Sequence, residues 1–402
     1  MTNAAGIGGG QAVLLLATPL LARMYSPEDF GVYATLAAIA AVAATLMALR
    51  FDAAIPATED DQVLPIFHAA LVLVLVFTLA SVAVFTLFPE MLAGYAVTSV
   101  PLYLMAVTAG LMGAVNVYQA LYVRRGEFGR VAGIKFFQPF FFALIGLWGV
   151  LGLSDAFVAS WVLILLFAVW GARGSWAGAS RQASLRAAMA ARRYPLVSAP
   201  TALLDAASLA LPLLFIAHAF GEADAGNYSQ VQRLLAAPLL LLGLASGQVF
   251  FKSAGDLHRG GRSVESLVWK FVLAFAALGL VLSAATWLLG EPLLRLVLGE
   301  GWRVDRYFLL LVIAPVVFRM VVSPVSSIFL VKDRLGLLGA WQLLYFLSAL
   351  TVIFLSLGKA KVEDYLILMV CAEFGMYLVY LLLVIWVMRD ARPGRPRNVC
   401  QE

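Results

Sequence analysis

The feature that most constrains this chain is a series of apolar runs, each about 18 residues or longer, which recur from one end to the other. Hydrophobic residues make up 63% of the sequence and charged residues 13%, whereas soluble domains contain roughly 45–50% and about 25%. The pattern predicts an all-α polytopic membrane protein. We expect about twelve spans, at residues 4–22, 33–50, 64–88, 101–123, 131–151, 155–172, 196–219, 227–250, 266–289, 307–330, 335–357 and 364–388.

The distribution of Lys and Arg predicts the topology and the domains. These residues concentrate in alternate loops, on the side that also holds both ends of the chain, so we expect both termini in the cytoplasm. The same bias accounts for the formal net charge of +5 without a nucleic-acid partner. We predict an N-terminal six-helix bundle at 1–172, a basic cytoplasmic linker at 173–195, a C-terminal six-helix bundle at 196–390 and a cytoplasmic tail at 391–402.

An internal repeat supports this division into halves. The sequence PLL, followed by the spacing D-x-G-x-Y, occurs at residues 19–33 and again at 212–228, with Gly31 and Gly226 as the central glycines. Internal repeats are how many transporters build two bundles around a central site. In the predicted topology, both copies form the turn after the first helix of a six-helix half. The repeat therefore predicts two pseudo-repeated bundles around a central cavity.

Four ionisable residues are predicted to lie within the membrane: Asp205, Arg233, Arg319 and Glu373. An ionised side chain at the middle of a span costs about 2.5–3.5 kcal/mol, so such residues usually face a bundle interior or a water-filled cavity. Arginine suits a phosphate-bearing ligand because its guanidinium donates paired hydrogen bonds and stays charged when partly desolvated. The alternative is that these residues form structural ion pairs, Asp205 with Arg233 and Glu373 with Arg319.

The sequence offers little for other chemistry. The three histidines lack metal-ligand spacing, and Cys371 and Cys400 provide no disulfide framework. Glu28 and Asp29 are adjacent, but their loop is short, and an acidic first turn of a helix explains them. We therefore expect no metal, no cofactor and no enzymatic activity. Asp205 and Glu373 are the candidates for coupling to a proton or sodium gradient.

Several segments resemble a known family. ATPLLARMYSPEDFGVY at 17–33 and LRFDAAIPATEDD at 49–61 are similar to the first hairpin of bacterial polysaccharide flippases, and GNYSQVQRLLAAP at 226–238 and LGEGW at 298–302 are further matching stretches. This family contains the Wzx-type O-antigen and exopolysaccharide exporters of the multidrug/oligosaccharidyl-lipid/polysaccharide exporter superfamily. The resemblance covers the twelve-span plan and is most specific in the first hairpin.

The resemblance implies a flippase that moves isoprenoid-pyrophosphate-linked oligosaccharide, such as an O-antigen or exopolysaccharide repeat unit, across the bacterial cytoplasmic (inner) membrane by alternating access. It also implies a cationic central cavity. The substrate-binding candidates are Arg23, Arg50 and Arg233, which lie in matching segments, and Arg319, which rests on its membrane depth alone. The expected partners are the lipid-linked oligosaccharide, membrane lipids and polysaccharide polymerase or assembly proteins.

Two other functions remain open from the sequence. A multidrug or cation antiporter of the same superfamily would be expected to carry more acidic than basic residues in its cavity, and this chain leans toward arginine. A membrane-embedded polysaccharide polymerase or ligase would handle the same substrates. Such enzymes generally need a large external loop, and the external loops predicted here are short.

Overall fold

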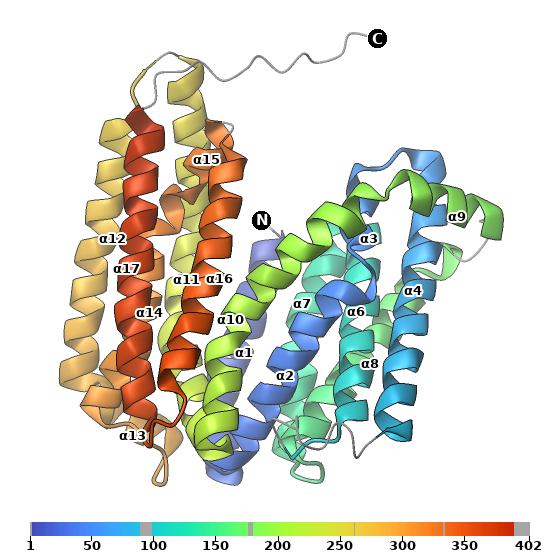
Figure 1. Ribbon diagram of the computed structural model, residues 1–402. Helices are drawn as coiled ribbons and strands as arrows, with labels where there is room; N and C mark the ends of the chain where they lie inside the picture. Colours follow the sequence, from blue (N-terminus) through green and yellow to red (C-terminus); the bar gives the residue numbers. More distant parts are fainter. Residues whose placement is uncertain (1, 89–98, 176–179, 261, 333, 390–402) are drawn as a thin grey trace. The chain divides into compact units, whose positions relative to one another are not determined.

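The computed structural model describes residues 2–88, 99–175, 180–260, 262–332 and 334–389, and in these residues it contains only helices and the turns between them (Figure 1). Eleven helical segments of this described part are long and apolar enough to cross a membrane. A further helix, α11, runs without interruption for 38 residues and contains the predicted eighth span. These observations confirm an all-α membrane protein with about twelve spans. The predicted tail at 391–402 lies outside the described residues.

The long helices are α1 (Thr2–Met24), α2 (Pro27–Met47), α4 (Asp60–Leu87), α6 (Leu102–Arg124), α7 (Phe128–Trp148), α8 (Leu153–Gly171), α10 (Ala199–Phe220), α11 (Glu222–Arg259), α12 (Glu265–Ala285), α14 (Arg306–Val322), α16 (Leu335–Ser356) and α17 (Val362–Arg389). The shorter helices are α3 (Phe51–Ala54), α9 (Arg181–Ala190), α13 (Glu291–Leu298) and α15 (Ile328–Val331).

Large apolar side chains on these helices point away from the protein. Leu16 is 79% exposed, and Leu280 and Phe354 are each 72% exposed. Such surfaces would favour association in water, whereas lipid tails are as apolar as leucine. The exposed faces are therefore suited to contact with acyl chains, as a multi-pass membrane protein requires.

The turn between α1 and α2 shows how the sequence starts a helix. The Ser26 hydroxyl accepts a hydrogen bond from the Asp29 backbone N–H at 3.2 Å, and the Asp29 carboxylate accepts one from the Ser26 backbone N–H at 2.9 Å. Pro27 occupies the first helical position, where its missing N–H costs nothing. Glu28 and Asp29 therefore form an acidic first helix turn, as predicted, and Asp29 serves as a cap.

The basic segment between the predicted halves is partly helical. Within it, α9 (Arg181–Ala190) begins at Ser180, whose hydroxyl accepts a hydrogen bond from the Ala183 backbone N–H. The chain then forms one turn of π-helix at Tyr194–Ser198 before entering α10. Helix α9 packs against α4 of the first bundle.

The contacts divide the chain into two compact units. The N-terminal unit contains residues 1–230 together with 296–302, and the C-terminal unit contains 231–295 and 303–402. The division falls inside α11 and not at 173–195. The predicted six-helix bundles at 1–172 and 196–390 follow the sequence repeat, and they remain a prediction.

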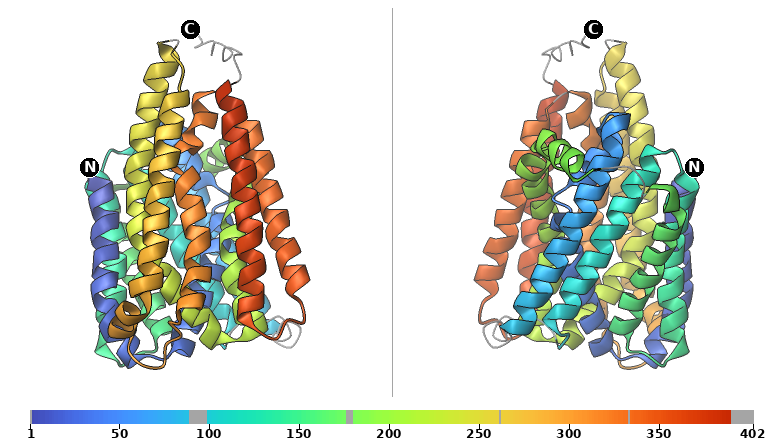
Figure 2. Two further views of the ribbon diagram at one scale, coloured as in Figure 1. Left: turned by 90° about the vertical axis from the view of Figure 1, so that its left-hand side faces the viewer. Right: turned by 90° about the vertical axis from the view of Figure 1, so that its right-hand side faces the viewer.

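Each unit has its own packed interior. In the N-terminal unit, α2 and α4 pack against α6, and α1 and α8 pack against α7 (Figures 1 and 2). Tyr118 and Tyr122 of α6 and Phe67 of α4 are almost fully buried at its centre. In the C-terminal unit, α14 packs between α12 and α17, and α16 packs against α17. Phe329 and Val384 are completely buried there.

Candidate functional site

The two copies of the sequence repeat meet one another in the N-terminal unit. A Cβ atom added to Gly31 in α2 would lie 1.8 Å from the Glu222 carbonyl oxygen, and one added to Gly226 in α11 would lie 1.8 Å from the Pro27 carbonyl oxygen. Real Cβ contacts are never this short, so only glycine fits at either position. The contact is reciprocal: each glycine packs on the first turn of the other helix. The repeat is thus a structural feature, with its two copies related to one another across the crossing of α2 and α11.

Two buried polar residues follow the crossing at equivalent positions. Thr35 lies one helical turn after Gly31 and is 0% exposed, while Gln230 lies one turn after Gly226 and is 2% exposed. The Thr35 hydroxyl and the Gln230 side-chain nitrogen have no hydrogen-bond partner among the described residues. Buried polar groups are usually paired. Neither residue stands out in the sequence, because a lone threonine or glutamine in an apolar run carries no signal of its own.

The LGEGW segment packs on the first hairpin. The Trp302 indole N–H donates a hydrogen bond to the Ala22 carbonyl at 3.1 Å, and its ring meets Phe30 edge-on at a centroid distance of 5.2 Å. Arg23, at the end of α1, donates a hydrogen bond to the Leu296 carbonyl at 3.2 Å. Two of the segments that carry the family resemblance therefore contact each other directly. Arg23 is exposed at this contact, and its role in substrate binding remains a prediction.

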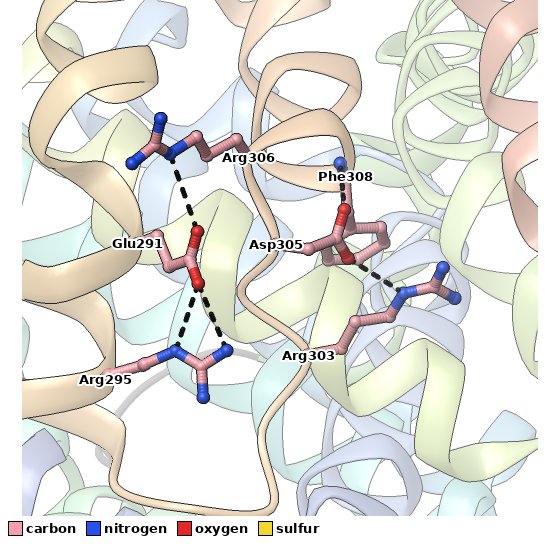
Figure 3. Close-up of polar contacts among 6 residues, drawn as sticks. All are labelled: Glu291, Arg295, Arg303, Asp305, Arg306 and Phe308. Atoms are coloured by element: carbon pink, nitrogen blue, oxygen red, sulfur yellow. Dashed lines mark hydrogen bonds and ion pairs between the residues drawn. The ribbon is translucent and has the colours of Figure 1, made fainter.

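The residues on either side of 296–302 belong to the C-terminal unit and form ion pairs there (Figure 3). Glu291 accepts hydrogen bonds from Arg295 of the same helix, the shorter at 3.1 Å, and also lies 3.6 Å from Arg306. On the other flank, Arg303 pairs with Asp305 at 3.3 Å. Exposed pairs of this kind contribute about 0–1 kcal/mol each. Their effect is to fix where the chain leaves and re-enters this unit.

The second flank also starts a helix. Asp305 caps α14 by accepting a hydrogen bond from the Phe308 backbone N–H at 3.0 Å (Figure 3). Arg303 lies over the Phe308 ring, 5.1 Å from its centroid, and forms a further ion pair with Glu363 near the start of α17. The loop is thus tied to both α14 and α17.

Arg50 lies at a strained turn between α2 and α3. Leu49 has φ 47° and Arg50 has φ 62°, both in the left-handed region that non-glycine residues seldom adopt. Such conformations cost about 1–3 kcal/mol each and are concentrated at functional sites. The Arg50 guanidinium lies 3.5 Å from the Asp52 carboxylate, and its Nε is buried without a hydrogen-bond partner in the described structure. The role of Arg50 in substrate binding remains a prediction.

Asp52 is affected by the same surroundings. It lies in α3, between the spans formed by α2 and α4. Burial raises the pKa of Asp52, and the nearby Arg50 guanidinium offsets part of this effect.

A polar network lies inside the C-terminal unit. Arg319 of α14 donates hydrogen bonds to the Tyr377 hydroxyl at 2.9 Å and to the Tyr345 hydroxyl at 3.2 Å. The Tyr345 hydroxyl in turn donates to the Glu373 carboxylate at 2.5 Å. The structure therefore brings Arg319 and Glu373 together through Tyr345. The two tyrosines were missed, although Tyr377 follows Glu373 by four residues on the same helix face, a spacing that could have revealed it.

The other two intramembrane charges belong to different units. Asp205 is exposed in α10 of the N-terminal unit, and Arg233 is half-buried in α11 of the C-terminal unit. Their pairing and their substrate-binding roles remain predictions. Among the described residues, no group of three or more His, Cys, Asp or Glu side chains is arranged to hold a metal ion.

Comparison with solved structures identifies the fold. An inward-facing multidrug resistance MATE family transporter of the MOP superfamily aligns over 98% of this chain and 96% of its own, with a TM-score of 0.57 and 15% identity. An outward-facing structure of such a transporter aligns over 96% of this chain and 94% of its own, with a TM-score of 0.55 and 14% identity. The chain is thus a helical membrane protein with the fold seen in MATE family transporters.

The sequence itself identifies the family. The profile described as "Polysaccharide biosynthesis protein" matches residues 20–305, which is more than half of the chain. The chain belongs to this family. Together with the fold, the match confirms the resemblance to the polysaccharide flippases of the multidrug/oligosaccharidyl-lipid/polysaccharide exporter superfamily. No curated protein matches the sequence.

Proposed function

We propose that the protein is a flippase that carries an isoprenoid-pyrophosphate-linked oligosaccharide across the bacterial cytoplasmic membrane, with both termini in the cytoplasm. The observation that carries this proposal is the family match across residues 20–305 in a chain whose fold is that of MATE-type transporters. The substrate would be an O-antigen or exopolysaccharide repeat unit. Polymerase and assembly proteins would then take up the product on the outer side.

The arginines supply the chemistry that this substrate needs. A pyrophosphate loses its hydration when it enters a membrane protein, and guanidinium groups replace that hydration with charge-assisted hydrogen bonds. The Arg50 guanidinium lies 3.5 Å from the Asp52 carboxylate, and its Nε has no hydrogen-bond partner in the described structure. Arg233 lies about two helical turns after Gly226, and Arg319 lies inside the C-terminal unit. The lipid tail would remain in the bilayer while these groups hold the head.

A multidrug or cation antiporter is the second candidate, because the solved structures with this fold include multidrug transporters. At 14–15% identity this likeness extends only to the fold. The family match favours polysaccharide synthesis. A polymerase or ligase is the third candidate, and the site of glycan accumulation distinguishes it from a flippase.

The test is to locate lipid-linked glycan in cells that lack the protein. A flippase predicts accumulation on the cytoplasmic leaflet, which is protected from reagents added to intact spheroplasts. Accumulation of flipped but unpolymerised units on the outer leaflet would instead indicate an enzyme. The wild-type protein should restore export in these cells.

Arg233 provides the matched variants. Arg233→Ala should fail to restore export although it inserts normally, and Arg233→Lys should restore part of it, because the charge remains but the paired hydrogen bonds do not. The control is Lys252→Ala, which removes an exposed cation from the same helix. Normal export by Arg233→Ala would remove this residue from the site.

A further inference from the structure

Glu373 is buried inside the C-terminal unit with only one of its two oxygens satisfied. Its side chain lies in α17, and the residue is 9% exposed. One oxygen, Oε1, accepts the hydrogen bond from the Tyr345 hydroxyl at 2.5 Å. The other, Oε2, is buried and has no hydrogen-bond partner among the described residues. An ionised carboxylate in this position would keep one of its two oxygens buried without a hydrogen bond.

The nearest cation is not directly paired with it. Arg319 directs its Nε to Tyr377 and one terminal nitrogen to Tyr345, and the described structure contains no ion pair between Arg319 and Glu373 within 4.0 Å. Tyr345 therefore accepts a hydrogen bond from the cation while it donates one to the carboxylate. It is a relay between the two charges.

The surroundings contain few other groups that could influence Glu373. Among the described residues of this unit, α14, α15 and α16 pack against α17. Arg319 is the charged group from α14, and Tyr345 is the titratable group from α16. Helix α15 is entirely apolar in sequence, and Tyr377 is the titratable group one turn further along α17 itself.

These neighbours favour a proton over a metal ion as the ligand of Glu373. Sodium and other hard cations need several oxygen ligands, whereas the hydroxyls closest to Glu373 already accept hydrogen bonds from a guanidinium. The positive charge of Arg319 would repel a metal cation at the same place. A proton requires only one oxygen, and Oε2 is unoccupied by any hydrogen bond in the described structure.

The net charge of the network formed by Glu373, Tyr345 and Arg319 depends on whether Glu373 is ionised. When Glu373 is ionised, its negative charge balances Arg319 through Tyr345, and the network is neutral overall. When a proton forms an O–H bond at Oε2, the carboxyl becomes neutral and Arg319 is left as a net positive charge inside the membrane. An uncompensated cation there favours a change of conformation or the binding of an anion.

We propose that Glu373 is a proton-binding site of the C-terminal unit, and that Tyr345 transmits its charge state to Arg319. Proton binding by Glu373 does not depend on which substrate the protein transports. The further step, in which this proton drives the transport of a glycan lipid, rests on the proposed function.

The experiment is infrared difference spectroscopy of the purified full-length protein, titrated between about pH 4 and about pH 9 without substrate. A buried protonated carboxyl gives a carbonyl stretching band that disappears on ionisation. The wild type should show such a band, and Glu373→Gln should lose it. The control Asp364→Asn, near the start of the same helix, should keep it. Identical spectra for the wild type and Glu373→Gln would mean that Glu373 is a permanently ionised structural bridge, and would overturn the proposal.

A second variant covers the case in which Glu373→Gln does not fold. Tyr345→Phe keeps the aromatic ring beside Trp341 and removes only the hydroxyl that stabilises the ionised carboxylate. The midpoint of the Glu373 band should then move to higher pH by about one unit. An unchanged midpoint would contradict the relay. Because neither measurement uses a substrate, a failure of glycan transport would overturn the proposed function without affecting this result.

Discussion

Gly31 of α2 and Gly226 of α11 pack so closely that each one's missing side chain makes room for the backbone of the other helix. The two residues occupy the same position in the two copies of the repeat, about 195 residues apart in the sequence. Close approach of helices through small residues is common in membrane proteins, where lipid supplies no hydrophobic driving force for helix association. Here both copies of the repeat require a glycine at the helix contact.

We predict that Gly31→Ala and Gly226→Ala each destabilise the protein by about 1–3 kcal/mol or more, because the added methyl group overlaps a carbonyl oxygen. Thermal unfolding in detergent measures the effect. Gly243→Ala is the control, since a Cβ atom at that position of α11 meets nothing within 4 Å. It should be neutral or stabilising, because alanine favours the helix. Equal unfolding temperatures for all three variants would refute the close contact.

The packing of Trp302 on the first hairpin gives a second prediction. Trp302→Phe should cost about 0.5–1.5 kcal/mol, because it removes the hydrogen bond to the Ala22 carbonyl and retains an aromatic ring beside Phe30. Trp302→Ala should cost more, since the buried ring is lost as well. Trp148→Phe, at a side chain that is 74% exposed, should have little effect. A similar loss at Trp148 and Trp302 would argue against the contact.

The network around Tyr345 predicts a compensating pair of substitutions. Arg319→Gln should destabilise the protein, because Glu373 then keeps a buried charge without a cation nearby. Glu373→Gln should also destabilise the protein, because it leaves the positive charge of Arg319 buried without a compensating negative charge. The double variant has no net buried charge and should be more stable than the Arg319→Gln single variant. A double-mutant cycle on thermal unfolding measures the coupling, and strictly additive losses would indicate that the two charges are independent.

The raised pKa of Asp52 predicts a pH dependence of stability. Burial raises this pKa above the ordinary value of 3.8, so the folded state binds the proton more tightly than the unfolded state does. The contribution of Asp52 is therefore fully present below pH 3.8 and is lost as the pH rises through the folded-state pKa. Asp52→Asn removes this slope. As the pH rises above 3.8, the unfolding temperature of Asp52→Asn should increase relative to that of the wild type. Parallel curves of unfolding temperature against pH for the two proteins would exclude the effect.

Much of the fold was predictable because the membrane imposes a simple rule. Every backbone polar group must be satisfied within a span, so each long apolar run became a helix, and the acidic turn at Asp29 became a helix cap as expected. The repeat predicted two related copies, but spacing alone did not reveal that Gly31 and Gly226 touch. A pairwise contact between distant segments requires three-dimensional packing.

The candidate site was less predictable. Arg319 and Glu373 were found from their depth in the membrane, because charges in apolar runs are conspicuous. Tyr345 was not found, since tyrosine is an ordinary component of an apolar helix. Only the structure shows that its hydroxyl lies between two charged groups. The left-handed backbone at Leu49 and Arg50 was also not predictable, because neither residue type favours that conformation.

The length of α11 has a mechanical consequence. Its 38 residues span about 57 Å, whereas the hydrocarbon core of a bilayer is about 30 Å thick. The boundary between the two units falls after Gln230, close to one end of this single helix. The part of α11 that follows the boundary is about 43 Å long. A bend of only about 10° at the boundary would therefore move the C-terminal end of the helix by about 7 Å. A small rearrangement beside the paired glycines would therefore be magnified into a large displacement at Arg259.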